Sequence, residues 1–241
     1  MNLLSNDYCL YCYQEIPSKF TWTSFFRGEK EKTLCNQCRS RLQWIEGETC
    51  EICSRPLAHL PNKWVINGKC KDCVFWERSD KWSNVLTKNE SIYIYNDFFK
   101  ELLAKFKYRG DYALAKIFAE DIRKKLSALT FDIIVPIPLS EERLYERGFN
   151  QTESLLEEAE IPYTPMLKRI HTEKQSKKNR IERLKLSNVF QLIEPPPILL
   201  NKSILLFDDI YTTGTTVRQA ALLLKTYGAT TVSSFTLCRG V

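Results

Sequence analysis

The stretch of sequence that decides the fold is "ILLFDDIYTTGTT", which runs from Ile204 to Thr216. Its leading apolar residues are typical of a buried strand in a parallel sheet, and we expect that strand to be central. The acids Asp208 and Asp209 would stand at its carboxyl end, where open parallel sheets bind their ligands. The threonine-rich turn that follows would open a helix, so the stretch predicts a strand, a binding turn and a helix in succession.

The chemistry of this turn suits a phosphorylated sugar. A helix N-terminus offers unpaired amides and a partial positive charge, which favour phosphate. Gly214 permits close approach of the backbone, and hydroxyl groups come from Thr212, Thr213, Thr215 and Thr216. Because carboxylates accept hydrogen bonds from sugar hydroxyls, the whole set fits a ribose 5-phosphate. The turn lacks the lysine of a P-loop and the three glycines of a dinucleotide fingerprint. An ordinary strand-turn-helix with a capping threonine stays open as the plain alternative.

The flanking sequence has an α/β pattern from about residue 85 onward. Strands are predicted at 91–95, 131–139, 203–207 and 230–237, and helices at 96–108, 111–126, 149–160 and 216–227. Strands that alternate with helices indicate a parallel sheet flanked by helices. We therefore expect an α/β domain at 86–241, preceded by a small domain at 1–85.

The small domain is defined by its cysteines. Eight of the nine cysteines fall in four pairs, each with two intervening residues: Cys9 and Cys12, Cys35 and Cys38, Cys50 and Cys53, Cys70 and Cys73. Two such pairs complete a tetrahedral Cys₄ zinc site, so four pairs predict two structural zinc ions in a double zinc ribbon. Sequential pairing is the simpler arrangement, but the spacing leaves a cross-braced one open. Metal binding would supply folding energy that so small a ribbon cannot obtain from apolar burial.

The composition and the N-terminal sequence indicate in which compartment the protein works. The chain has 241 residues, of which 44% are hydrophobic and 27% charged, and a formal net charge of +6. No apolar run approaches the roughly 20 residues of a membrane helix, so we expect no membrane insertion. No secretory signal is visible at the N-terminus. We therefore expect a cytoplasmic protein, whose reduced thiols favour metal over disulfides.

Much of the positive charge is concentrated in one run. Between Lys168 and Lys185 stand eight basic residues against two acidic ones. Such a run suits a solvated loop, a lid over pyrophosphate, or a contact with single-stranded nucleic acid, and the three are not exclusive. The nucleic-acid contacts that we expect here are Lys174, Lys177, Lys178, Arg180 and Arg183.

These segments together carry a resemblance to a known family. "LLFDDIYTTGTT" resembles the phosphoribosyl pyrophosphate (PRPP) motif of type I phosphoribosyltransferases. The cysteine-pair ribbons, "FKYRGDYALAK" (106–116), "IVPIPLSEERLYERGFNQTE" (134–153) and "KRIHTEKQSKKNRIERLKLSNVF" (168–190) resemble the ComF family. These are bacterial competence proteins with a phosphoribosyltransferase-like domain, and the resemblance covers nearly the whole chain.

The resemblance implies a type I phosphoribosyltransferase-like fold with a PRPP site. By that implication Asp208 and Asp209 would hold the ribose hydroxyls, and the residues from Thr212 to Thr216 the 5-phosphate. Arg143 and Arg147 would face the pyrophosphate. Mg²⁺ would accompany PRPP, held largely by the oxygens of the ligand itself.

Three functions stay open on the sequence. The first, implied by the resemblance alone, is a PRPP-binding protein that acts in DNA uptake during natural transformation. Its partners would be single-stranded DNA and other competence proteins such as a helicase. The second is an active phosphoribosyltransferase that transfers ribose 5-phosphate to a nucleobase or amine, although no base-specificity segment is recognisable. The third is a regulator that senses PRPP through a change of conformation.

Overall fold

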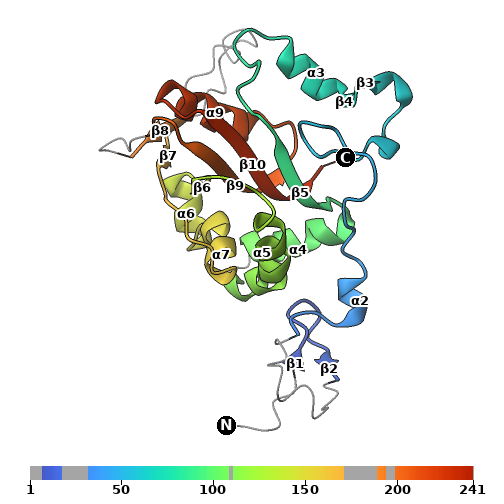
Figure 1. Cartoon of the computed structure of the whole chain (residues 1–241). Coiled ribbons are helices and arrows are strands. Elements are labelled where there is room, and N and C mark those ends of the chain that lie inside the picture. The colour runs from blue at the N-terminus through green and yellow to red at the C-terminus, as the bar shows by residue number, and fades with distance from the viewer. Residues whose placement is uncertain (1–6, 18–31, 109–110, 171–188, 194–198, 241) are drawn as a thin grey trace, which may run out of the picture.

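The centre of the computed structural model is a four-stranded parallel sheet (Figure 1). The structure describes residues 7–17, 32–108, 111–170, 189–193 and 199–240. The strands lie in the order β5 (Asn89–Ile94), β10 (Thr231–Arg239), β9 (Ser203–Tyr211) and β6 (Ile133–Pro136). The predicted fold class is confirmed, and the decisive stretch does form a central strand.

The acid pair lies inside β9 rather than after its end. The strand was expected to stop at Phe207, but β10 continues to pair with it, Thr236 opposite Asp208 and Cys238 opposite Ile210. On its other side β9 loses its partner earlier, because β6 ends with Pro136 opposite Phe207. Asp208 and Asp209 therefore stand beside an edge that β6 has left free.

Alternate side chains of β9 enter two different cores, because successive residues of a strand point to opposite faces. Leu205 and Phe207 pack in one core, and Ile204 and Leu206 in the other. The first core is covered by α4 (Asp97–Tyr108), the 3-10 helix η3 (Tyr112–Phe118), α5 (Ala119–Leu126) and α7 (Gln151–Glu158). The second core is covered by α9 (Thr215–Thr226) (Figure 1). Within the described ranges, no helix combines the length and the apolar character that crossing a membrane would require.

Two local elements differ from the expectation. The helix expected over 111–126 begins as the 3-10 helix η3 and becomes α-helical only at Ala119. A further helix, α6 (Glu141–Arg147), has no buried residue and so gave no apolar stripe to recognise. The Ser140 hydroxyl caps its start by accepting from the Arg143 amide at 3.4 Å, and Gly148 ends it at a φ of 78°.

The basic run begins within β7 (Leu167–Arg169), which pairs in antiparallel fashion with β8 (Phe190–Leu192). Lys174, Lys177, Lys178, Arg180 and Arg183 lie outside the described residues. Their predicted contact with nucleic acid therefore stays a prediction.

The cysteine-rich region forms two separate ribbons (Figure 1). The first ribbon contains β1 (Asp7–Tyr8), β2 (Glu15–Ile16) and α2 (Asn36–Arg39). The second ribbon contains the 3-10 helices η1 (Leu57–His59) and η2 (Asn62–Trp64), then β3 (Val65–Ile66), β4 (Lys69–Cys70) and α3 (Lys71–Glu77). Each ribbon adds cysteines to a different core of the α/β domain, the first to the core under α4 and the second to the core under α9.

Candidate functional site

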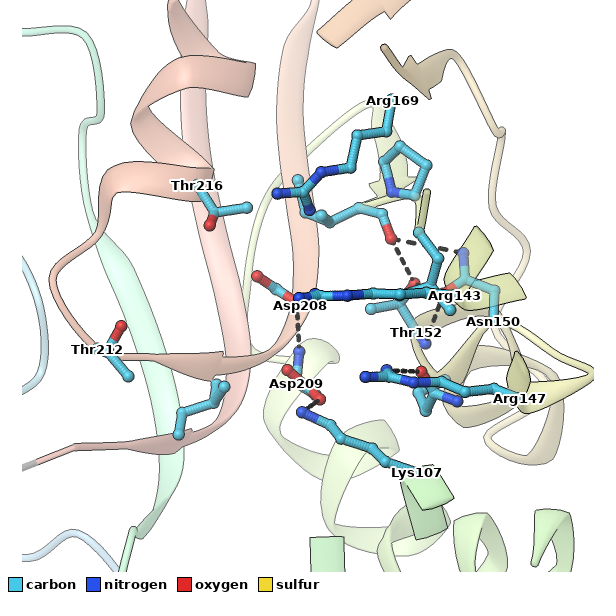
Figure 2. Close-up of a pocket in the computed structure, with 15 residues that line it drawn as sticks. Lys107, Arg143, Arg147, Asn150, Thr152, Arg169, Asp208, Asp209, Thr212 and Thr216 are labelled. Carbon is cyan, nitrogen blue, oxygen red and sulfur yellow. Dashed lines mark hydrogen bonds and ion pairs between the residues drawn. The ribbon is translucent and has the colours of Figure 1, made fainter. Parts of the chain in front are cut away.

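A pocket of about 200 Å³ opens at the edge that β6 leaves free (Figure 2). Its floor is the acid pair of β9, and the loop after β9 forms one wall. The opposite wall comes from α6 and from the N-terminus of α7. The polar lining includes Lys107, Arg143, Arg147, Asn150, Thr152, Arg169, Asp208, Asp209, Thr212 and Thr216.

The structure brings together six of the site residues expected from the sequence. Asp208, Asp209, Thr212, Thr216, Arg143 and Arg147 line this one pocket. Thr213 and Thr215 lie in the same loop, where their hydroxyl groups are 2.9 Å apart and share a hydrogen bond. The Thr213 carbonyl turns to the second ribbon and accepts from the Trp76 indole N–H at 2.9 Å.

Asp209 is held by a lysine that the sequence did not single out. The Lys107 ammonium, from the last turn of α4, forms an ion pair with the Asp209 carboxylate, and the two side chains are 17% and 11% exposed. Burial alone would lower the pKa of Lys107, but the Asp209 carboxylate raises it above its ordinary value. Lys107 therefore stays charged, and Asp209 has its counterion inside the protein.

The charge of Asp208 is affected most by the burial of its side chain. Burial, followed by the neighbouring Asp209 carboxylate, raises the pKa of Asp208 to about 8. The Asp209 amide donates to its Oδ1 at 2.9 Å, which together with Lys107 and Arg169 opposes that rise. Of the two adjacent acids, Asp209 is the one that forms the ion pair with Lys107.

The pocket has more positive than negative side chains. Lys107, Arg143, Arg147 and Arg169 face the two carboxylates (Figure 2). Burial and the nearby Arg143 lower the pKa of Arg169, although Asp208 opposes the change. Crowded cations of this kind favour an anionic ligand, whose charge relieves their mutual repulsion.

Hydrogen bonds within and around the segment "RGFNQT" (147–152) hold the second wall of the pocket in place. Asn150 caps α7, its side-chain oxygen accepting from the Thr152 amide at 3.2 Å. The Arg147 guanidinium donates to the Gln151 side chain at 2.7 Å, and the Thr152 hydroxyl donates to the Ile137 carbonyl at 2.9 Å. These bonds fix Arg147 and tie the start of α7 to the end of β6.

Gly214 has a structural role in addition to the ligand contact expected from the sequence. It adopts a left-handed φ of 81°, which disfavours any side chain. A Cβ atom there would overlap the hydroxyl end of the buried Tyr211 ring before it reached a ligand. The glycine is therefore required by the packing of the loop on Tyr211.

The eight paired cysteines form two four-residue groups, each with sulfur atoms within 4.8 Å of one another. These groups are Cys9, Cys12, Cys35 and Cys38 in the first ribbon, and Cys50, Cys53, Cys70 and Cys73 in the second. The sulfur–sulfur separations of 3.8 Å (Cys12 to Cys35) and 3.6 Å (Cys53 to Cys70) match the edge of about 3.8 Å of a tetrahedron with Zn–S bonds of about 2.3 Å. The pairing is sequential rather than cross-braced, and both groups fit structural zinc.

Comparisons with known proteins agree with both halves of the chain. A phosphoribosyl transferase domain family matches residues 115–240, and a double zinc ribbon domain family matches residues 1–74. The "Competence protein ComFC" of Bacillus subtilis is 39% identical over 235 residues, covering 96% of this chain and 94% of that protein. The "Competence protein ComFC" of Streptococcus pneumoniae is 34% identical, with 96% and 99% covered. The "DNA utilization protein YhgH" of Escherichia coli is 26% identical, with 86% and 96% covered.

Proposed function

The chain belongs to the ComF family of competence proteins, and from that premise we propose that it binds PRPP and acts on single-stranded DNA during natural transformation. One observation carries the PRPP half of the proposal. The acid pair, the start of α9 and a set of arginines line a single pocket, as a sugar with phosphate at both ends would require.

Each part of PRPP has a chemical partner in this pocket. Asp208 and Asp209 accept hydrogen bonds from the ribose hydroxyls. The 5-phosphate lies at the N-terminus of α9, where free amides and the hydroxyls of Thr212 and Thr216 donate to it. The pyrophosphate faces the cationic wall, where Arg143 and Arg147 give charge-assisted hydrogen bonds.

Two kinds of metal ion belong to this proposal. Each ribbon holds one structural Zn²⁺ through its four thiolates. Mg²⁺ accompanies PRPP and is held largely by the oxygens of the ligand.

Calorimetric titration with PRPP and Mg²⁺ tests the ligand directly. We expect saturable binding of one PRPP per chain. Bound material is then assayed for pyrophosphate release with a panel of nucleobases and amines, because an active phosphoribosyltransferase is the alternative reading of the same pocket. Release that depends on one acceptor would establish the enzyme. Binding without turnover would support the competence protein or a PRPP-sensing regulator, and absence of binding would reject the proposed ligand.

The DNA half of the proposal rests on the basic run and on the names of the relatives, and it is tested by salt dependence. We expect Lys177→Glu with Lys178→Glu to weaken binding of single-stranded DNA and to reduce the slope of log affinity against log salt by about 1.4, since each phosphate contact contributes about 0.7. Lys100→Glu with Lys116→Glu, two exposed lysines on α4 and η3, is the control with the same charge change. Equal affinity in both double variants would remove the basic run from the DNA site.

A further inference from the structure

The second ribbon touches the segment from the last residue of β9 to the first residues of α9 (211–216), which we call the phosphate loop. The Trp76 indole N–H, on α3, donates to the Thr213 carbonyl at 2.9 Å. Arg218, on the first turn of α9, is fully buried and lies with its guanidinium 5.3 Å from the centre of the Trp76 ring. The same guanidinium donates to the Glu77 carboxylate at 3.4 Å. Trp76 and Glu77, two successive residues of the second ribbon, thus form hydrogen bonds with Thr213 and Arg218, which lie before and within the first turn of α9.

Arg239 makes a second connection, from the sulfur atoms to the same loop. This buried side chain donates to the Cys53 carbonyl at 3.0 Å and to the Cys53 sulfur at 3.4 Å. Its other nitrogen donates to the Tyr211 carbonyl at 3.1 Å, and its guanidinium lies 4.8 Å from the centre of the Tyr211 ring. An N–H donor to a cysteine sulfur stabilises a thiolate, so one arginine serves both the cysteine group and the first residue of the phosphate loop.

The bond from Trp76 also sets the direction of a backbone amide. A peptide unit is planar and trans, so its carbonyl and its N–H point in opposite directions. Because the Thr213 carbonyl faces the ribbon, the Gly214 N–H faces away from it. That amide is one of the free donors at the start of α9, where an anion would bind. A loop held in this way binds an anion without first losing conformational entropy.

We propose that the second ribbon positions the phosphate loop for its anion, with Trp76 as the positioning residue and the Cys50, Cys53, Cys70 and Cys73 group as its anchor. This inference rests on the proposed binding of PRPP and adds a condition to it. Zinc in the second ribbon raises affinity for the ligand, and by linkage the bound ligand retains that zinc. The first ribbon packs instead on α4, where the Tyr11 ring meets Phe98 at 4.8 Å between ring centres.

The test compares two tryptophans of the same ribbon. Trp76→Phe keeps an aromatic ring and removes the N–H donor, and Trp64→Phe makes the same change at a partly exposed position on η2. We expect PRPP affinity to fall about two- to tenfold in Trp76→Phe, the effect of one hydrogen bond, and to stay unchanged in Trp64→Phe. Thermal unfolding and zinc content are measured for both variants, and a fall in affinity at full zinc content identifies positioning rather than loss of structure.

Zinc release supplies a readout that a purely structural role would not change. We expect PRPP to slow the transfer of one of two zinc ions to a chelator in the wild type and in Trp64→Phe, and to slow it less in Trp76→Phe. Equal PRPP affinity in all three proteins, or release of both ions at rates that PRPP does not alter, would overturn the inference while leaving the PRPP site intact. A wild type that does not bind PRPP would overturn the proposed function and this inference with it.

Discussion

Replacing Lys107 by methionine removes the internal counterion of Asp209 at the floor of the pocket. The two side chains are 17% and 11% exposed, so the pair is largely withdrawn from water. Removing one partner of such a pair costs about 3–5 kcal/mol, because the other charge is left buried and alone. We therefore expect Lys107→Met to lower the free energy of unfolding by about 3–5 kcal/mol.

A double-mutant cycle isolates the pair itself. Asp209→Asn should cost a similar amount, because it leaves the Lys107 ammonium without a partner. The double variant should lose much less than the sum, with a coupling of at least about 2 kcal/mol, since replacing both charges removes the uncompensated one. Unfolding by urea, followed by circular dichroism, gives the four free energies. Lys100→Met, at an exposed position of the same helix, is the control and should stay within about 0.5 kcal/mol of the wild type. Costs that simply add would refute the view that Lys107 acts through Asp209.

Three further predictions concern protonation, metal and the loop. The ionised carboxylate of Asp208 accepts more strongly from a hydroxyl than the protonated acid does, and burial raises its pKa to about 8. PRPP affinity should thus rise, by up to about tenfold, from pH 7 to pH 9 in the wild type but not in Asp208→Asn. Between about pH 4 and pH 8 the Asp208 carboxyl group holds a proton in the folded state but not in the unfolded chain. Its presence should therefore make the free energy of unfolding fall as pH rises through this range. If the difference in free energy of unfolding between wild type and Asp208→Asn showed the opposite trend, the assignment would be contradicted. Elemental analysis of the reduced protein should find two zinc ions per chain, and a value of one or less would reject the pair of sites. Gly214→Ala should lower both stability and PRPP affinity, because a Cβ at 214 meets the hydroxyl and the ring of Tyr211 and because a φ of 81° disfavours a side chain. A free energy of unfolding equal to that of the wild type would contradict this reasoning.

The parallel sheet could be predicted because its strands are short apolar runs next to recognisable turns. The strand at 203–207 was found in this way, although its extension to Tyr211 depends on pairing with β10, which local sequence does not contain. Helix α6 was missed for a different reason. It has no buried residue, and periodicity detects only helices with an apolar face.

The site was only partly predictable from the sequence. Asp208, Asp209 and the threonines share one turn, so their chemistry was visible in a single stretch. Lys107 and Arg169 reach the same pocket from α4 and β7, and only tertiary packing brings them there. In α4 Lys107 occupies a polar position among apolar ones, which is typical of any amphipathic helix. The contact of Trp76 with Thr213 spans 137 positions of sequence and left no local signal.

The spacing of the cysteines predicted two metal groups but not their relation to the rest of the chain. The ribbons were expected as a small domain at 1–85. In the structure Cys9 and Cys38 share a core with α4, and Cys53 bonds to Arg239 of the central sheet. A substitution such as Cys35→Ser is therefore expected to weaken the contact with α4 as well as to unfold the first ribbon.

The measurement that tests the central claim most directly compares PRPP with inorganic pyrophosphate as ligands of Asp209→Ala, which removes the acceptor as well as the charge. The claim is that the acid pair binds ribose hydroxyls while the cationic wall binds pyrophosphate. Calorimetry should show PRPP affinity reduced about ten- to a hundredfold, the effect of losing a hydrogen bond to a charged acceptor. Pyrophosphate affinity should be kept or raised, because the pocket loses a negative charge, and its retention also shows that the variant is folded. Equal PRPP affinity in wild type and variant, or an equal loss for both ligands, would contradict the account.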